Sequence, residues 1–494
     1  MRLSELFGRA GLECPEEAEE IQVRNIVTDS RRVEKGSLFI CLKGMSTDGH
    51  EYMDEAIKSG ASVIVAEQVR DACVGGAAAI ILHDNTRSVA ARLYNAWYGN
   101  PTKRLKIVGV TGTNGKTSVS TMLYEVFTSL GYKAGLIGTV KCLSVGGKVL
   151  KITSKDPLAN MTTPDPEELY CALAQFVRDG AEYVFMEVSS HALALGKVDA
   201  ICFELAVFTN LSRDHLDFHG TMDEYFKAKC RLFELSRIGL VNTDSEYGEK
   251  LALGCPCPFL TVSETYGDFC AQNVKYHGAA GSEYILKYPN GECFISIPLA
   301  GEFSVTNSML CASAALVCGL NPQGVSFALS RVRGAEGRME RVRIPTDEFS
   351  VIIDYAHTPD ALEKLLKSVR RIRAPHGHTI LVFGCGGERD RSKRREMGQI
   401  ASLLADFVII TSDNCRGEDP ERIFSDILTG IDKEKPYCLI KERSAAIESA
   451  VMSARYGDII VLAGKGHERY EINNGVKRPF DERKIVKAAC KKRC

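Results

Sequence analysis

A glycine-rich segment from Gly109 to Ser118 carries the residue types that bind a nucleotide phosphate. It reads GVTGTNGKTS, follows the short apolar run LKIVGV and precedes a helix-like segment. Glycines allow backbone N–H groups to point toward a common centre, and the next helix adds the positive end of its dipole. Lys116 would reach the β- and γ-phosphates, and the Thr117 hydroxyl would join a Mg²⁺ ion. Val110 replaces the first glycine of the strict phosphate-loop pattern, yet the order of strand, loop and helix still predicts a nucleotide site.

Two later segments offer further ligands for such a metal ion. The apolar run in AEYVFMEVSSH ends at Glu187, and a strand tip is a common place for a carboxylate that holds a phosphate-bound metal. His215 lies among charged residues in FTNLSRDHLDFHG, after another apolar run. From its type and spacing alone, His215 is more typical of a structural histidine than of a ligand. Glu187 is thus a candidate ligand, and the role of His215 stays open.

A second polar cluster, Ser412 to Pro420, follows the apolar run FVIITS near the end of the chain. It reads SDNCRGEDP and places an amide, a thiol, a guanidinium and carboxylates after a predicted strand. Ligands of open α/β sheets bind beyond the carboxyl ends of the strands. The segment is therefore a candidate site loop, and the residues alone leave open whether the Cys415 thiol takes part in chemistry or packs.

The elements that must position these clusters alternate between apolar strands and amphipathic helices, which is typical of an α/β fold. The first hundred residues have the pattern of a small α/β domain. Strands and helices then alternate as in a doubly wound sheet to about Arg333. A third unit with the same alternation of strands and helices begins at FSVIIDYAHTPDALEKLL. A chain of 494 residues is too long for a single hydrophobic core. We therefore expect about three domains.

Composition narrows the class of protein. The formal net charge of −1 argues against binding nucleic acid through bulk electrostatics. The sequence has no apolar run long enough for a membrane helix and no signal-peptide core at its start, so we expect a cytoplasmic enzyme. Its 18 cysteines are scattered without a Cys-x-x-Cys pair, which favours buried thiols in a reducing cell over disulfides or structural zinc.

The order of the motifs resembles that of the Mur ligases over essentially the whole chain. The segments that carry this resemblance are VTGTNGKTS, MEVSSHAL, FTNLSRDHLDFHG, EYFKAKC, LAGEFSVTNSMLCASAA, GRMERV, DYAHTPDAL, FGCGGERDRSKRREMG, DNCRGEDP and GKGHERY. The family implies a three-domain architecture with a central P-loop ATPase sheet. The expected domains are a UDP-sugar-binding α/β domain (1–99), an ATP-binding domain (100–336) and a Rossmann-like amino-acid-binding domain (337–494).

Within that family the chain is most similar to the enzymes that add the third residue of the peptidoglycan stem peptide. The resemblance implies that ATP phosphorylates the D-Glu side-chain carboxylate of a UDP-N-acetylmuramoyl dipeptide. The amine of a diamino acid then attacks the acyl phosphate, which gives an amide, ADP and phosphate. Such a reaction depends on positioning and electrostatics, so cationic and metal clamps matter more than a nucleophilic side chain.

The resemblance also assigns roles to residues. The ATP-binding positions are Gly112, Thr113, Asn114, Gly115, Lys116, Thr117, Asn307, Arg338, Asp354 and His357. The Mg²⁺ positions are Thr117, Glu187, His215 and a carbamoylated Lys229, and with Lys116 the last three form the expected catalytic set. By itself Lys229 is more typical of a solvated helix lysine, and only its register with the family motif gives it this role. The UDP-sugar positions are Ser30, Thr162, Thr163, Ser189 and Lys197.

The incoming amino acid is expected in the third domain. Its contacts by resemblance are Arg389, Asp413, Asn414, Arg416, Gly464 and Glu468. Meso-diaminopimelate ends in a carboxylate where lysine has only an ammonium. A guanidinium can pair with that carboxylate bidentately and would repel the terminal cation of lysine. Arg416 therefore favours diaminopimelate as the substrate.

The chain departs from the family pattern at two positions that touch these sites. Lys197 stands where arginine is common beside the UDP-sugar, which keeps the charge and loses the bidentate fork. Cys415 stands where proline is usual, so we expect a non-catalytic thiol and a somewhat freer loop.

Several alternatives remain at this stage. A lysine-adding ligase or a folylpolyglutamate synthase-type ligase would share the phosphate loop. A regulatory protein with a decayed ligase site belongs to a different class, and the intact Lys116, Glu187, His215 and Lys229 argue against it. We further expect a monomer that binds neither nucleic acid nor a membrane.

Overall fold

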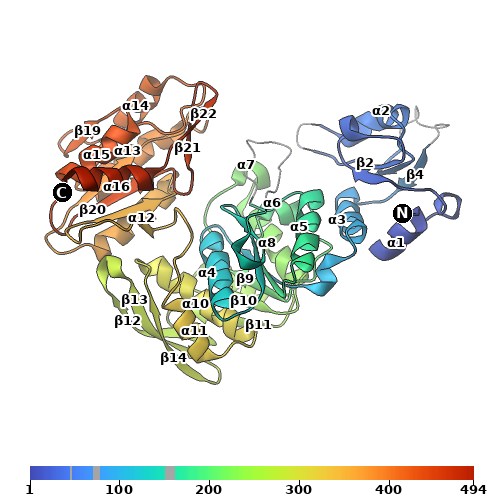
Figure 1. The fold of residues 1–494 in the computed structure, drawn as a ribbon, viewed down its shortest axis with the longest axis horizontal. Coiled ribbons are helices and arrows are strands. Elements are labelled where there is room, and N and C mark those ends of the chain that lie inside the picture. Colours follow the sequence, from blue (N-terminus) through green and yellow to red (C-terminus); the bar gives the residue numbers. More distant parts are fainter. Residues whose placement is uncertain (45–46, 70–77, 151–161, 494) are drawn as a thin grey trace. The chain divides into compact units, whose positions relative to one another are not determined.

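The computed structural model describes every residue except 45–46, 70–77, 151–161 and 494, and it forms two compact units, Met1–Val262 and Ser263–Cys494 (Figure 1). Both units combine helices with largely parallel sheets, which confirms the predicted α/β class. Within the described ranges, no helix has both the length and the apolarity that a membrane crossing requires.

The first unit begins with a small parallel sheet in the order β1-β2-β3-β4. Its central strands are buried along their whole length, as parallel strands covered by helices must be. The elements are α1 (Leu3–Ala10), β1 (Asn25–Val27), β2 (Ser37–Ile40), α2 (Met53–Lys58), β3 (Val63–Ala66), β4 (Ala79–Leu82) and α3 (Thr86–Trp97).

The larger sheet of the first unit has the order β11-β10-β9-β5-β8-β6-β7. Strand β5 lies between β8 and β9 and is parallel to both. The strands are β5 (Lys106–Thr111), β6 (Ala134–Ile137), β7 (Cys142–Leu143), β8 (Tyr183–Glu187), β9 (Leu205–Phe208), β10 (Gly239–Asn242) and β11 (Phe259–Ser263). Because β5, β8 and β9 run parallel, their carboxyl ends meet at one edge of the sheet, where a ligand site is expected.

Helices connect these strands. They are α4 (Lys116–Ser129), α5 (Pro166–Arg178), α6 (Ser190–Ala194), α7 (Leu216–His219), α8 (Met222–Glu234) and α9 (Glu246–Leu253). Helix α4 follows β5 after a short loop, as the sequence predicts. Helix α8 packs against β5 and α6, and this brings its buried face toward the start of that loop.

The second unit starts with antiparallel strands and two helices. Strand β13 pairs with both β12 and β14, and α11 packs on β14 and α10. The elements are β12 (Phe269–Tyr276), β13 (Ser282–Tyr288), β14 (Gly291–Ile297), α10 (Glu302–Val317) and α11 (Pro322–Leu329).

The rest of the second unit is a sheet in the order β15-β16-β20-β17-β18-β19. Its strands are β15 (Glu340–Arg341), β16 (Ser350–Asp354), β17 (Thr379–Phe383), β18 (Phe407–Ile410), β19 (Tyr437–Leu439) and β20 (Ile459–Ala463), followed by the hairpin β21 (Tyr470–Asn473) and β22 (Val476–Pro479). Its helices are α12 (Pro359–Ile372), α13 (Ser392–Leu404), α14 (Pro420–Leu428), α15 (Arg443–Ser453) and α16 (Glu482–Arg493).

Helices cover both faces of this sheet. Helices α12, α13 and α14 contribute to one buried cluster, whereas α15 and α16 contribute to another on the opposite face. The strands β16, β20, β17 and β18 are parallel neighbours. Their carboxyl ends therefore share one edge, and the polar segments after β17, β18 and β20 lie together there.

Candidate nucleotide and substrate sites

The phosphate loop joins β5 to α4 through two glycines in the left-handed region. Gly112 has a φ of 145° and Gly115 a φ of 90°, which residues with a Cβ rarely adopt. A Cβ on Gly112 would also lie 1.9 Å from Thr209 Oγ1. The predicted glycine turn is therefore required by the backbone at Gly112, and it brings the loop up to the N-terminus of α4.

Lys116 is the first residue of α4 and its ammonium turns back over the loop. Nζ donates to the carbonyl oxygens of Gly112 (2.8 Å) and Thr113 (2.9 Å). The loop is held from the other side by Thr209, whose hydroxyl donates to the Asn114 carbonyl at 2.6 Å. These contacts place one positive charge at the mouth of a turn that already presents a helix N-terminus, as phosphate binding requires.

Glu187 ends β8 and is almost completely buried beside this loop. Its Oε2 accepts hydrogen bonds from Thr117 Oγ1 (2.9 Å) and Thr139 Oγ1 (3.0 Å), and its Oε1 accepts one from the Thr139 N–H (2.9 Å). A Cβ at residue 138 would lie 2.3 Å from Oε1, so a side chain there would displace the carboxylate from these bonds. A carboxylate and a hydroxyl held side by side are the oxygen ligands that Mg²⁺ prefers. The structure thus brings together two of the predicted metal residues.

Lys229 is buried rather than solvated, being only 1% exposed on α8. Its Nζ donates to the Gly112 carbonyl at 2.8 Å and lies 4.6 Å from the centre of the Tyr225 ring. Burial, reinforced by the nearby charge of Lys116, holds the pKa of Lys229 well below its usual range. The side chain therefore shares an acceptor with Lys116, and its burial favours the neutral form of the amine.

His215 lies in a cluster of three histidines. It has a left-handed φ of 52°, and its ring centre lies 4.8 Å from that of His191, which lies 5.5 Å from that of His219. Burial lowers the pKa of His215, and Lys116 and Lys229 lower it further. Burial and the two other histidines lower the pKa of His191 to about 4. A neutral imidazole beside the phosphate loop is available as a ligand.

His191 and His219 are functional candidates that the sequence reading missed. His191 stands in the motif MEVSSHAL and His219 in the motif FTNLSRDHLDFHG. Nothing in their spacing indicates that α6 and α7 bring them to His215. Within the described ranges, no group of three or more His, Cys, Asp or Glu side chains has the geometry of a metal site.

Three of the predicted UDP-sugar residues lie beside Glu187. Thr163 Oγ1 donates to the Glu187 carbonyl (2.9 Å) and accepts from the Ser189 N–H (3.0 Å). Thr162 Oγ1 lies at hydrogen-bond distance, 3.0 Å, from Thr139 Oγ1. A continuous polar strip therefore leads from the carboxylate to residues 162 and 163.

The two other predicted UDP-sugar residues have different surroundings. Lys197 forms an ion pair with Asp165, with Nζ 2.7 Å from Oδ1. Ser30 belongs to the N-terminal sheet region, where its hydroxyl lies 3.5 Å from Glu55 Oε2. The grouping of Ser30 and Lys197 with residues 162, 163 and 189 stays a prediction.

The predicted ATP contacts of the second unit gather around Tyr355, except for Asn307 on α10. The Arg338 guanidinium lies 4.8 Å above the Tyr355 ring, and the His357 ring lies 4.6 Å from it. Asp354 ends β16 and accepts from the backbone N–H groups of residues 339 and 356 at 2.7 and 2.8 Å. Burial raises the pKa of Asp354, and this effect exceeds the lowering of the pKa by the two hydrogen bonds.

The loop after β18 presents Asn414 at the centre of a buried polar network. Asn414 Nδ2 donates to Glu468 Oε2 (2.7 Å), and its Oδ1 accepts from Lys465 Nζ (3.1 Å) and the Ile472 N–H (2.9 Å). Burial and the charge of Asp413 raise the pKa of Glu468. Gly464 has a φ of 113°, and a Cβ there would lie 2.6 Å from Asp413 Oδ2. The predicted residues 413, 414, 464 and 468 are thus brought together.

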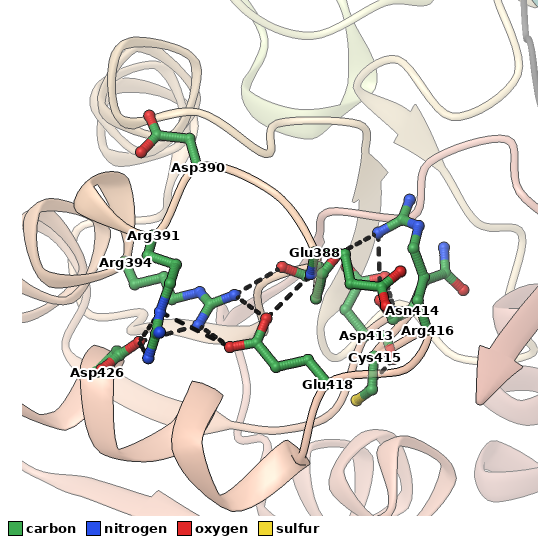
Figure 2. Close-up of polar contacts among 12 residues, drawn as sticks. Glu388, Asp390, Arg391, Arg394, Asp413, Asn414, Cys415, Arg416, Glu418 and Asp426 are labelled. Carbon is green, nitrogen blue, oxygen red and sulfur yellow. Dashed lines mark hydrogen bonds and ion pairs between the residues drawn. The ribbon is translucent and has the colours of Figure 1, made fainter. Parts of the chain in front are cut away.

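Arg416 lies at the edge of this network in the left-handed region, with a φ of 55°. Its N–H donates to the Ile472 carbonyl (3.1 Å), and its Nη1 donates to the carbonyls of Gly387 (2.8 Å) and Asn414 (3.4 Å). In the described part of the chain, Nε and Nη2 have no hydrogen-bond partner. Figure 2 shows the guanidinium extending away from Cys415. Arg389, the remaining predicted contact, is exposed in the turn after β17.

Cys415 is a packing residue. Its side chain is 3% exposed, its thiol donates to the Asp413 carbonyl at 3.5 Å, and burial raises the pKa of the thiol to about 11. The loop on either side of it is tied by the hydrogen bonds of residues 414 and 416. These ties oppose the loop freedom that we expected from the loss of proline. The described cysteines are all free thiols, but they are not all buried as we expected, because Cys171 and Cys202 are exposed.

Comparison with known proteins shows that the chain is similar to Mur ligases along most of its length. Family models match it as the Mur ligase family catalytic domain (residues 22–107), the Mur ligase middle domain (110–315) and the Mur ligase glutamate ligase domain (337–466). A relative from Clostridioides difficile (strain 630), named UDP-N-acetylmuramoyl-L-alanyl-D-glutamate--2,6-diaminopimelate ligase, is 41% identical, with 94% of each chain covered. A relative of the same name from Parabacteroides distasonis is 39% identical over 99% of this chain and 98% of its own.

Solved structures agree with this placement. A structure of a UDP-N-acetylmuramoyl-L-alanyl-D-glutamate--2,6-diaminopimelate ligase matches with a TM-score of 0.72 and 33% identity, covering 100% of this chain and 99% of the other. A folylpolyglutamate synthase from Mycobacterium tuberculosis, at 18% identity and a TM-score of 0.60 over 82% and 94% of the two chains, shares the fold alone. Fold and phosphate loop thus define a nucleotide-dependent α/β ligase. The chain belongs to the Mur ligase family of ATP-dependent amide ligases.

Proposed function

We propose that this chain joins meso-diaminopimelate to UDP-N-acetylmuramoyl-L-alanyl-D-glutamate at the cost of ATP. The observation that carries the proposal is the Arg416 guanidinium, which is held by Nη1 and leaves Nε and Nη2 open beside Asn414. Relatives that cover nearly the whole chain are named for this reaction. The product is a UDP-muramyl tripeptide, a precursor of peptidoglycan.

The residues of the first unit suit the phosphorylation of the D-Glu carboxylate. Lys116 and the N–H groups of the loop would bind the ATP phosphates, and Thr117 and Glu187 would hold Mg²⁺ through oxygen ligands, with His215 near them. When bound, Mg²⁺ neutralises charge that develops on the transferred phosphoryl group. The ammonium of Lys116 would stabilise the same developing charge from its position on the loop. Asn307, Arg338, Asp354 and His357 of the second unit stay predictions as ATP contacts.

The residues of the second unit suit the recognition of an amino acid with two ends. Asp413 and Glu468 are carboxyl groups around the Asn414 amide and can accept from ammonium groups. The two open guanidinium nitrogens of Arg416 can take a carboxylate bidentately. Lysine would place a cation there instead. The geometry therefore favours diaminopimelate over the alternative of lysine.

The expected carbamate on Lys229 is supported by the surroundings of its amine. Carbon dioxide adds only to a neutral amine, and the burial that lowers the pKa of Lys229 favours that neutral form. A carbamate would convert this buried amine, which lies near the charge of Lys116, into an anion that can orient a metal ion. We expect isotope-labelled bicarbonate to give a carbamate carbon signal in NMR spectra of the protein. The signal should vanish in Lys229→Met and persist in Lys227→Ala, a variant of the exposed lysine one half-turn away on α8. Its persistence in Lys229→Met would contradict the assignment.

Other expectations from the sequence keep that status. They are the domain boundaries at 1–99, 100–336 and 337–494, the UDP-sugar contacts of Ser30 and Lys197, the monomeric state and the cytoplasmic location.

The proposed function is tested by omitting one substrate at a time. Phosphate release should require ATP, the UDP-muramyl dipeptide and meso-diaminopimelate together, because the acyl phosphate forms only on the dipeptide and turns over only when an amine attacks it. Release from ATP alone would instead indicate a plain P-loop ATPase. No release under any condition would indicate a decayed ligase site.

A further inference from the structure

Arg394 is a fully buried arginine of α13, with no side-chain exposure. Its Nη1 and Nη2 donate to Oε1 and Oε2 of Glu418 at 2.8 and 2.7 Å. Nη1 also donates to Asp426 Oδ2 (2.9 Å), and Nη2 to the Gly386 carbonyl (3.2 Å). Figure 2 shows this fork lying beside the loop that carries Arg416. A bidentate buried pair of this kind fixes orientation as well as charge.

Glu418 connects the fork to two segments at once. Its Oε2 accepts from the Glu388 N–H at 3.0 Å, so it holds the turn after β17. Its own N–H donates to the Cys415 carbonyl at 3.0 Å, so it holds the loop after β18. Arg394 keeps the carboxylate charged, because this ion pair lowers the pKa of Glu418 to about 2.

The turn held by Glu418 is the support of the Arg416 side chain. The Gly387 N–H donates to the Asn414 carbonyl at 2.9 Å, and the Gly387 carbonyl accepts from Arg416 Nη1 at 2.8 Å. The two segments are so close that a Cβ on Gly387 would lie 2.0 Å from the Cys415 carbonyl oxygen. The position of the Gly387 carbonyl therefore determines where the Arg416 guanidinium points.

We propose that the Arg394–Glu418 ion pair is a positioning element for Arg416, and that it sets the preference of the enzyme for an amino acid that ends in a carboxylate. The inference rests on the proposed function for its substrate. Neither side chain contacts the amino acid. They act through the turn at residues 386–388, and a displaced turn would leave Arg416 charged but aimed away from the carboxylate.

Asp426 provides a matched control within the same network. It accepts from Arg394 Nη1 at 2.9 Å and from Arg391 at 3.3 Å, but among the described residues its carboxylate bonds to neither the turn nor the loop. Asp426→Asn and Glu418→Gln each remove one negative charge from the partners of Arg394. Only Glu418→Gln also alters a side chain that bonds to the turn, through the hydrogen bond from the Glu388 N–H to Glu418 Oε2.

The test compares these two variants in steady-state kinetics with meso-diaminopimelate and with L-lysine. We expect Glu418→Gln to raise KM for meso-diaminopimelate about tenfold or more, since small misplacements of a binding group cost up to about a hundredfold. The ratio of kcat/KM for meso-diaminopimelate over lysine should fall by a similar factor. KM for ATP and for the UDP-muramyl dipeptide should stay within about twofold, as expected when only one subsite is disturbed. Asp426→Asn should leave the selectivity ratio unchanged.

A second readout does not depend on the substrate. Cys415 is buried between the two held segments, so its rate of alkylation by iodoacetamide, followed by peptide mass, reports on the loop. The rate should rise in Glu418→Gln and stay near the wild-type rate in Asp426→Asn. If Glu418→Gln does not fold, Glu418→Asp serves the same test, because the shorter side chain cannot reach both Arg394 and the Glu388 N–H.

An unchanged selectivity ratio in Glu418→Gln, or an equal loss in both variants, would overturn the proposal. Failure of the wild-type enzyme to use meso-diaminopimelate would reject the proposed function instead. In that case an alkylation rate of Cys415 that does not respond to Glu418→Gln would also reject the positioning role.

Discussion

Replacement of Lys116 by alanine should lower kcat for tripeptide formation by about a thousandfold, the loss typical when a group that stabilises transition-state charge is removed. The ammonium is held over the phosphate loop by two carbonyls, so it needs little rearrangement to meet a phosphate. Alanine at the first residue of α4 is a good helix former, and the fold should survive. The loss would therefore appear in kcat rather than in the melting temperature.

Tripeptide formed from ATP and the two other substrates, measured by chromatography, gives this rate. Lys227→Ala is the control, because Lys227 is an exposed lysine paired with Glu224 and lies outside the loop. A Lys116→Ala enzyme with more than about a tenth of the wild-type kcat, less than 1.4 kcal/mol of lost stabilisation, would show that the loop is not the phosphate site.

Replacement of Arg416 by alanine should raise KM for meso-diaminopimelate about a hundredfold and leave KM for ATP unchanged. Two charge-assisted hydrogen bonds to the far carboxylate would be lost, at about 1.5 kcal/mol each. Activity with lysine, which is repelled by the guanidinium, should stay equal or rise. Arg416→Lys should restore only part of the affinity, since an ammonium cannot bind both oxygens in the fork geometry.

Initial rates with each amino acid give these constants. Arg422→Ala is a suitable control, because this exposed arginine on α14 lies in the same region of the chain and has no described side-chain partner. Equal losses for meso-diaminopimelate and lysine in Arg416→Ala would mean that Arg416 supports the loop and does not read the terminal carboxylate.

Local patterns in the sequence were sufficient to predict the phosphate loop. Strand, glycine turn and helix are contiguous in residues 106–129, so their order could be predicted from neighbouring residues, whereas the contact of Thr209 with the loop could not. The same holds for the polar segment after β18, because strand ends in parallel sheets have a fixed direction.

Contacts between distant segments could not be predicted in this way. The burial of Lys229 depends on how α8 packs against β5, and a lysine in a charged helix segment gives no local sign of it. The histidine cluster requires α6 and α7 to meet. Arg394 stands among several basic residues in RDRSKRRE, and only the approach of Glu418, which lies 24 residues later, distinguishes it from its exposed neighbours.

The substrate assignment is tested most directly by a competition between amino acids. The enzyme is incubated with ATP, Mg²⁺ and UDP-N-acetylmuramoyl-L-alanyl-D-glutamate in the presence of equal amounts of meso-diaminopimelate, L-lysine and L-glutamate, and the mass of the nucleotide product is measured. We predict that the product gains the mass of one meso-diaminopimelate residue. A product that carries lysine or glutamate, with no diaminopimelate adduct, would contradict the account.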